Sequence, residues 1–451
     1  MSTEQVQELS SVTDVTESVI EAPRYSCALG GAYACVMETA GAIPILHSGG
    51  GCGFAQWWAM SLGAGAVGSG RSGGCNALCS SLLEEHVVFG GEKKLRDLIK
   101  SGIELMNGDF FVVIPGCIPS IVGDDVNSVV SEFREQVPII NTNTSGFVGN
   151  SYSGYESYLN AVIEQLLPKT TPKKQNDLVN IFGIAPRQQV FWGGDLQEIK
   201  RTFEKVGIKA NILFGELEGL ENLKKIPYAA HNIVLSPWLG IQAAEKLKEL
   251  YGTEYTIFPF VPIGPKETTR FLYHVGEKIG ISKEILKSVT EIEERKAYRL
   301  FEYLGDILII GMPSAYYAVV ADSSTAIGIT RYLTNEVGYL PELVIITDTP
   351  SEESRKTIIS ELTENIESDI KPEIKFEVDS HKIRNLLKNR KFMFLLSSSM
   401  EKFLAADEFH AVHLSISYPV WDRLLLDRSY MGYRGGTALM EDMVSKYAGP
   451  M

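Results

Sequence analysis

The fold class of this chain is decided by residues 110–125, FFVVIPGCIPSIVGDD. The stretch begins with the apolar run Phe110–Ile114, which has the length of a strand that is buried on both faces of a parallel sheet. It then passes through Gly116 into a segment with helical periodicity. A strand, a glycine turn and a helix in that order form a βα unit, so the stretch predicts an α/β fold.

The same pattern recurs along the chain. Further apolar runs bounded by turn residues lie at Leu178–Phe182, Asn232–Leu235, Asp306–Ile310, Leu343–Thr347 and Phe392–Leu396. Amphipathic stretches such as Asp195–Val206 and Ala243–Tyr251 alternate with these runs, as expected for helices that cover the faces of parallel sheets. The chain is therefore predicted to repeat βα units several times.

Two shifts in composition divide the chain. One is the polar segment 168–177, PKTTPKKQND, and the other is the charged helical region Ile281–Tyr303. Segments of this kind often separate domains because few contacts cross them. We predict three α/β lobes: residues 1–170, which contain all the cysteines, residues 171–300, and residues 301–451, which end in helices.

Composition narrows the choice of partners. The chain has 451 residues, of which 45% are hydrophobic, and a net charge of −14, which argues against general binding to nucleic acid or to an anionic membrane. No window of about 18 apolar residues predicts a membrane span. The N-terminus lacks the basic and apolar regions of a secretory signal. We expect a cytoplasmic protein whose partners are proteins or small molecules.

Three cysteines lie beside glycines where strands or turns are expected. They are Cys27 in YSCALGGAY, Cys52 in HSGGGCGF and Cys117 in PGCIPS. The carboxyl ends of the strands are where an α/β fold binds ligands. Neighbouring glycines let the backbone approach sulfur closely, which suits the thiolate ligands of an iron–sulfur cluster. The candidates for such an approach are Gly51, Gly53 and Gly116. The competing interpretation is that the cysteines are small buried hydrophobes.

These three cysteines are one thiolate fewer than a four-iron cluster normally needs. A four-iron cluster normally takes four thiolates, so the missing ligand is an oxygen or nitrogen donor or belongs to a second polypeptide. Cys75 and Cys79 would face one metal on a helix, but without a nearby histidine pair they cannot complete a tetrahedral zinc site. A metal role for this pair is therefore less favoured. Cys35 lies in an apolar helical stretch and is expected in the core.

Other polar residues have ordinary interpretations. His47 precedes Cys52 by five residues, and a satisfied buried histidine is favoured over a partner of a cluster. Asp124 and Asp125 are expected to cap or solvate a helix. The sequence contains neither a GxGxxG turn with its acidic partner nor a phosphate-binding P-loop, so neither nucleotide fingerprint is met.

Taken together, the three cysteine motifs resemble the nitrogenase component 1 family. They are residues 27–32, CALGGA, residues 45–52, ILHSGGGC, and residues 117–125, CIPSIVGDD. Residues 417–423, SYPVWDR, and residues 426–436, LDRSYMGYRGG, are similar to the ending of the family's β-type subunits. The resemblance runs across nearly the whole chain. It implies three Rossmann-like lobes with parallel sheets in an α2β2 assembly.

The resemblance also implies a cofactor and two partners. Cys27, Cys52 and Cys117 would supply half of an iron–sulfur cluster shared with an α-type subunit, either an eight-iron P-cluster (8Fe-7S) or a smaller 4Fe-4S cluster. Residues 81–91, SLLEEHVVFGG, resemble the segment whose phenylalanine lies where the ATP-dependent iron protein docks, which assigns docking to Phe89.

One loop departs from the family pattern. Residues 143–155, NTSGFVGNSYSGY, resemble a loop in which a serine just before Phe-Val-Gly can ligate the oxidised cluster. Here Gly146 stands at that place, and Ser145 lies one position earlier. Ligation by a serine is therefore in doubt. Trp57 and Trp58 follow Cys52 and are expected to pack at the subunit interface.

A subunit of this kind works as part of an oxidoreductase complex. It relays single electrons from the iron protein to a catalytic cofactor in the α-type partner, where the bonds are broken. Members of the family reduce dinitrogen, as in nitrogen fixation, or carbon–sulfur or tetrapyrrole bonds, and the resemblance does not choose among these substrates. The alternative is a scaffold subunit for cofactor assembly, which shares the fold. Retention of all three cysteine motifs favours the reductase.

Overall fold

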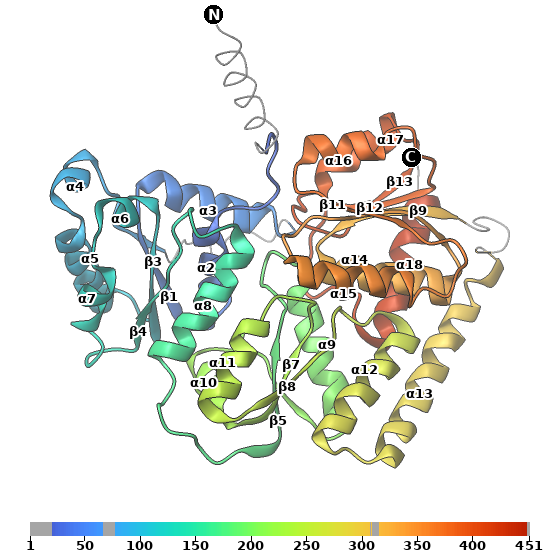
Figure 1. Ribbon diagram of the computed structural model, residues 1–451, viewed down its shortest axis with the longest axis horizontal. Helices are drawn as coiled ribbons and strands as arrows, with labels where there is room; N and C mark the ends of the chain where they lie inside the picture. The colour runs from blue at the N-terminus through green and yellow to red at the C-terminus, as the bar shows by residue number, and fades with distance from the viewer. Residues whose placement is uncertain (1–19, 66–76, 307, 309–314, 449–451) are drawn as a thin grey trace, which may run out of the picture.

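The computed structural model describes residues 20–65, 77–306, 308 and 315–448. These residues form three parallel β-sheets, each flanked by helices (Figure 1). The α/β fold with three sheets that the sequence predicts is thereby confirmed. No helix in these described ranges combines the length and the apolar character needed to cross a membrane.

The first sheet has the strand order β2-β1-β3-β4. Its parallel strands are β1 (Ala42–His47), β2 (Leu78–Cys79), β3 (Phe110–Pro115) and β4 (Ile139–Asn141). The helices around it are α2 (Ala28–Met37), α3 (Gly50–Leu62), α4 (Glu84–Phe89), α5 (Glu92–Leu105), α6 (Cys117–Val122), α7 (Val126–Ser131) and α8 (Ser151–Gln165). Because neighbouring strands are parallel, the carboxyl ends of β1, β2 and β3 meet at one edge of this sheet.

The second sheet has the strand order β6-β5-β7-β8. Its strands are β5 (Gln175–Phe182), β6 (Lys209–Asn211), β7 (Ala229–Val234) and β8 (Glu254–Ile257). Its helices are α9 (Trp192–Glu204), α10 (Leu220–Lys225) and α11 (Ile241–Tyr251), and α12 (Gly264–Ile279) and α13 (Lys283–Glu302) follow.

The third sheet has the strand order β11-β10-β9-β12-β13. Its strands are β9 (Tyr316–Ala321), β10 (Leu340–Ile346), β11 (Glu373–Phe376), β12 (Phe394–Ser397) and β13 (Val412–Ser415). The helices here are α14 (Ser323–Tyr332), α15 (Glu352–Thr363), α16 (Ser380–Leu387), α17 (Lys402–Asp407) and the terminal α18 (Gly432–Ala448). Buried apolar residues from all three sheets, such as Ile114, Ile181 and Val319, belong to one continuous core.

Most of the apolar runs form the expected strands. The runs that begin at Phe110, Leu178 and Leu343 lie in or overlap β3, β5 and β10. The run at Asp306–Ile310 is different. It lies partly outside the described residues, and its described members, Asp306 and Leu308, have helical backbone. The strand forms later, at Tyr316–Ala321, where Tyr317 and Val319 are fully buried.

Helices α2 and α8 meet backbone to backbone. A side chain added at Gly31 would collide with the carbonyl oxygen of Ser151, and one added at Gly154 would collide with the carbonyl oxygen of Ala28. The amide of Ala28 also donates to the carbonyl oxygen of Gly149 at 3.0 Å. Glycine is therefore required at both positions for the close approach, which fixes the N-terminus of α2 against the loop that leads into α8.

We expect Gly154→Ala to destabilise the protein by about 1–3 kcal/mol, because the added methyl group overpacks the contact between α2 and α8. This loss outweighs the gain of about 1 kcal/mol that alanine normally brings to a helix. Gly305→Ala is the matched control, since a Cβ at Gly305 meets no atom of the described residues within 4 Å. The midpoint of urea unfolding should fall for Gly154→Ala only, and equal midpoints would contradict the proposed packing.

Candidate metal centre

The three predicted ligand cysteines all lie at the beginnings of helices. Cys27 is the N-cap of α2, Cys52 is the third residue of α3, and Cys117 is the first residue of α6. Helices α3 and α6 begin after β1 and β3, at the carboxyl edge of the first sheet. The positive end of a helix favours a thiolate, so these positions suit metal ligands.

Cys27 and Cys117 come together at Gly146. The Gly146 amide donates to the Cys117 sulfur at 3.1 Å, and a Cβ at Gly146 would lie 3.0 Å from that sulfur and 3.8 Å from the Cβ of Cys27. A backbone bridge between Cys27 and Asn150 holds the same loop from the other side. Gly146 thus has a structural reason to replace a serine, because a side chain there would press on Cys117.

Gln56 links the helix of Cys52 to Cys27. It follows Cys52 by one helical turn, so both side chains project from the same face of α3. Its Nε2 lies 3.8 Å from the Cys27 sulfur. Gln56 is only 8% exposed, and its Oε1 has no hydrogen-bond partner among the described residues. Sequence reasoning missed Gln56, although its spacing of four from Cys52 was a usable signal.

The thiols influence one another electrostatically. Burial raises the pKa of the Cys52 thiol, and the neighbouring thiols of Cys27, Cys117 and Cys79 raise it further. Cys52 as a whole residue is exposed, so this burial is partial and comes from the loops around its sulfur. Crowded thiols cannot all ionise without a compensating cation, and bound iron would supply that charge.

The residues present therefore fit a metal–sulfur cluster. The donors are thiols, the Gly146 amide donates to the Cys117 sulfur, and the Nε2 of buried Gln56 lies 3.8 Å from the Cys27 sulfur. Within the described ranges, no three His, Cys, Asp or Glu side chains close on a single ion. The described cysteines therefore do not form a site for a single ion.

The other predicted site residues are Gly51, Gly53, Gly116 and Ser145, which neighbour the cysteines or Gly146 in the sequence. A Cβ at Gly116 would lie 2.9 Å from the Cβ of Ser48, and one at Gly53 would lie 3.3 Å from Leu46, whereas one at Gly51 would meet nothing within 4 Å. Their approach to a cluster stays a prediction. Ser145 is buried, and its carbonyl oxygen accepts from the Val148 amide.

The remaining cysteines separate into different environments. Cys35 is fully buried in the core, as predicted. Cys79 is the last residue of strand β2, so the helical pairing with Cys75 does not apply to it. Cys75 lies outside the described residues. Cys79 instead stands at the same sheet edge as the three predicted ligands.

His47 is a satisfied buried histidine, as predicted. Its Nε2 lies 3.1 Å from Oδ2 of Asp124, and its Nδ1 lies 3.1 Å from the hydroxyl of Ser80. The other oxygen of Asp124 accepts from the Gly91 amide at 2.8 Å. Burial lowers the pKa of His47 despite the hydrogen bond to Asp124, so the ring is neutral near pH 7. Asp125 caps α7 through the Ser128 amide.

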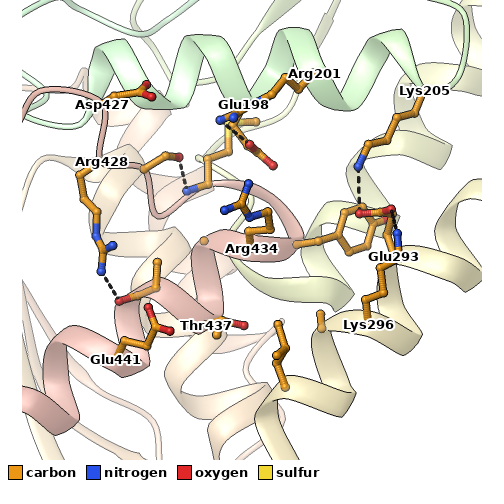
Figure 2. A pocket seen from close by; sticks show the side chains of 17 residues that line it. Glu198, Arg201, Lys205, Glu293, Lys296, Asp427, Arg428, Arg434, Thr437 and Glu441 are labelled. Atoms are coloured by element: carbon orange, nitrogen blue, oxygen red, sulfur yellow. Dashed lines mark hydrogen bonds and ion pairs between the residues drawn. The ribbon is translucent and has the colours of Figure 1, made fainter.

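A cavity of about 550 Å³ lies elsewhere, between α9, α13 and α18 (Figure 2). Its lining carries carboxylates, lysines and arginines but no thiol or imidazole. Lys205 pairs across the gap with Glu293 at 2.9 Å, and Arg201 pairs with Glu198 at 2.9 Å within α9. The chemistry of the thiol cluster is absent here, so this cavity is not the candidate metal centre.

Comparison with known proteins identifies a family for this chain. The family model described as "Nitrogenase component 1 type Oxidoreductase" matches residues 27–447. The molybdenum–iron protein β chain of nitrogenase from Clostridium pasteurianum is 25% identical over 403 residues, covering 82% of each chain. A solved structure, "Nitrogenase Cp1 at pH 6.5", superposes with a TM-score of 0.77 at 22% identity and covers 95% of this chain and 93% of that one.

A protein of cofactor assembly is also similar. The nitrogenase iron–molybdenum cofactor biosynthesis protein NifE from Methanococcus maripaludis is 27% identical over 274 residues, which cover 59% of this chain and 54% of that protein. The β chain from Clostridium pasteurianum is matched over a much larger share of this chain.

We expect His47→Leu to lower the stability of the first lobe. The change leaves Oδ2 of Asp124 without its histidine partner in a buried place, at a cost of about 1–3 kcal/mol. His381→Leu is the control, because His381 is exposed, and changes at exposed sites are usually worth less than about 0.5 kcal/mol. Urea unfolding measures both variants, and an unchanged midpoint for His47→Leu would show that the network is dispensable.

Proposed function

The chain belongs to the nitrogenase component 1 type oxidoreductase family and is similar to its β-type subunits, and from this premise we propose that it is the electron-relaying subunit of a component 1 reductase. Cys27, Cys52 and Cys117 hold its share of an iron–sulfur cluster, of the eight-iron P-cluster type or the smaller 4Fe-4S type. The meeting of Cys27 and Cys117 at Gly146, whose amide donates to the Cys117 sulfur, carries this proposal.

Residues of this chain tune the site. When bound, the cluster supplies one-electron storage and transfer. The Gly146 amide donates to the Cys117 sulfur, and the Gln56 amide group lies in reach of the Cys27 sulfur. Hydrogen bonds to ligand sulfur withdraw electron density, which raises the reduction potential. Gly51, Gly53 and Gly116 keep the backbone free of side chains around the ligands, and Ser145 is the nearest hydroxyl-bearing residue to Gly146 in the chain.

An α-type partner completes the ligand set. Cys52 is exposed and is flanked on α3 by Phe54 and Trp58, which are also exposed. Trp57 stacks obliquely on both neighbouring rings. An exposed apolar surface of this kind marks a protein interface, and here it surrounds a metal ligand. Covering this surface with the α-type partner would bury Cys52, in keeping with an α2β2 complex in which the partner holds the catalytic cofactor.

The docking surface for an ATP-dependent iron protein lies at the end of α4. Phe89 is 87% exposed, and Val88 beside it and Ile121 on α6 are exposed as well. The short helices α4 and α6 pack against each other, so this apolar surface lies next to the helix that begins with Cys117. An electron carrier bound there would be close to the ligand cysteines.

A scaffold for cofactor assembly is the second candidate, because NifE is among the similar proteins. Both candidates predict a cytoplasmic protein that binds neither membrane nor nucleic acid. They differ in the partner, since a reductase needs an α-type subunit that holds a catalytic cofactor. The substrate of the complex, whether dinitrogen or another multiple bond, depends on that partner.

Iron content tests the proposal. The complex is purified without oxygen together with its α-type partner, and its iron and its EPR spectra are measured. We expect Cys117→Ala to lose most of the iron at the interface and the matching EPR signal, because it removes a thiolate ligand. Cys35→Ala is the control, since Cys35 lies in the core away from the site. Wild-type iron and EPR in Cys117→Ala would refute the proposed role.

Docking has its own test. We expect Phe89→Ala to weaken binding of the iron protein about tenfold, because an exposed aromatic residue at the centre of an interface is a typical hot spot. The matched control is Leu217→Ala, since Leu217 is equally exposed but lies in the second lobe. A titration with labelled iron protein gives both dissociation constants, and equal values would remove Phe89 from the interface.

A further inference from the structure

Four thiols, rather than three, lie along the carboxyl edge of the first sheet. Strand β2 pairs with β1 so that Cys79 lies opposite Leu46, two residues before Ser48. Residues 48 and 49 form the turn into α3, which carries Cys52. The order of the sheet therefore places Cys79 at the end of one strand and Cys52 just beyond the end of its neighbour.

The Cys79 sulfur faces the turn that carries Cys52. The Ser81 amide donates to this sulfur at 3.4 Å, and the protonated thiol donates to the carbonyl oxygens of Ser48 and Gly49 at 3.8 and 3.9 Å, contacts that are given up when the thiol loses its proton to metal. A Cβ at Gly53 would lie 3.7 Å from the same sulfur. The Cys79 sulfur therefore lies close to the backbone of residue 53, which is next to Cys52 in the chain.

The environment of Cys79 differs from that of a structural cysteine. Cys35 is fully buried among apolar side chains, whereas Cys79 is half-buried and touches polar backbone groups. Free cysteine in a protein interior normally behaves as a small hydrophobe, which describes Cys35 well. Cys79 is thus partly accessible, and the Ser81 amide that donates to its sulfur favours the thiolate form.

A second observation links the helix of Cys52 to Cys27. Gln56 is nine-tenths buried on the face of α3 that carries Cys52, and its Nε2 lies 3.8 Å from the Cys27 sulfur. A Cβ at Gly30 would collide with the Gln56 Oε1, so this side chain also packs against the first turn of α2, which Cys27 caps. The helix of Cys52 and the helix that Cys27 begins are therefore held together beside the end of β2.

We propose that Cys79 is a fourth thiolate ligand, so that this chain alone can hold a complete four-iron, four-sulfide cluster on Cys27, Cys52, Cys79 and Cys117 before it joins a partner. A cluster of this type takes four thiolates, the number that these residues supply. Two ferrous ions, two ferric ions and four sulfide ions bind as the four thiols release four protons. The inference rests on the proposed function, because it uses the same three ligands.

The test uses the full chain alone, purified without oxygen and reconstituted with ferrous iron, ferric iron and sulfide. Iron and acid-labile sulfide are measured after gel filtration, and EPR is recorded before and after reduction with dithionite. We expect wild type and Cys35→Ala to retain equal amounts of iron and sulfide and to give the signal of a reduced four-iron cluster. Cys79→Ser should lose most of the iron or retain a three-iron cluster with a different EPR signal.

Two comparisons separate the possible failures. If Cys79→Ser matches wild type while Cys117→Ala loses its iron, the fourth ligand is refuted and the proposed function stands. If neither variant loses iron, both proposals are wrong. Circular dichroism of each metal-free variant identifies a folding defect, and such a variant is replaced by Cys79→Ala.

A measurement on the wild-type chain needs no substitution. Iodoacetamide labelling followed by mass spectrometry is carried out before and after reconstitution. We expect Cys79 to become protected on reconstitution together with Cys27, Cys52 and Cys117, because coordinated thiolates react slowly. Labelling of Cys79 that stays unchanged while the other three are protected would overturn the proposal.

Discussion

The backbone contact between α2 and α8 is the constraint on which the candidate metal centre depends. Gly31 and Gly154 allow the two helices to meet without side chains between them. Cys27, at the N-terminus of α2, is thereby held against the loop that enters α8, and Gly146 in this loop touches the Cys117 sulfur. Two candidate ligands far apart in the sequence are thus positioned by main-chain contacts. In the proposed relay, such rigidity would favour electron transfer because little reorganisation would accompany it.

The apolar runs in the sequence predicted the α/β fold, whereas the contacts within the candidate site depend on residues far apart in the chain. Continuous apolar runs such as Phe110–Ile114 identified buried parallel strands, since only such strands are apolar on both faces. The run at Asp306 misled because apolar composition alone does not distinguish a strand from a helix. Within the site, neighbouring glycines identified Cys27, Cys52 and Cys117 as candidate ligands. Gln56 was missed although it stands four residues after Cys52, because its contact with the Cys27 sulfur also depends on how α3 lies against α2.

The hydrogen-bond network of His47 connects the end of α4, where Phe89 lies, to the turn before Cys52. The Gly91 amide, two residues after Phe89, donates to Asp124, and Asp124 contacts His47 at the end of β1. Ser80 connects His47 to the Ser48 amide, which leads into the turn before Cys52. The apolar end of α4 is thus tied by polar contacts to the ligand loop. A partner that shifts α4 would act on the ligand loop through these bonds, whereas the His47 ring, neutral near pH 7, adds no charge.

The number of thiols at the sheet edge bears on the order of assembly. With three thiolates, a four-iron cluster on the isolated chain has one open coordination site, and loading would depend on the partner. With Cys79 as the proposed fourth ligand, the chain could be loaded first, and a ligand of the partner could later take the place of Cys79. Cys79 ends a strand of two residues at the edge of the sheet, where movement disturbs few contacts. A ligand that must leave during assembly is best placed on such an edge, whereas Cys27 and Cys117 lie on segments that packing holds in position.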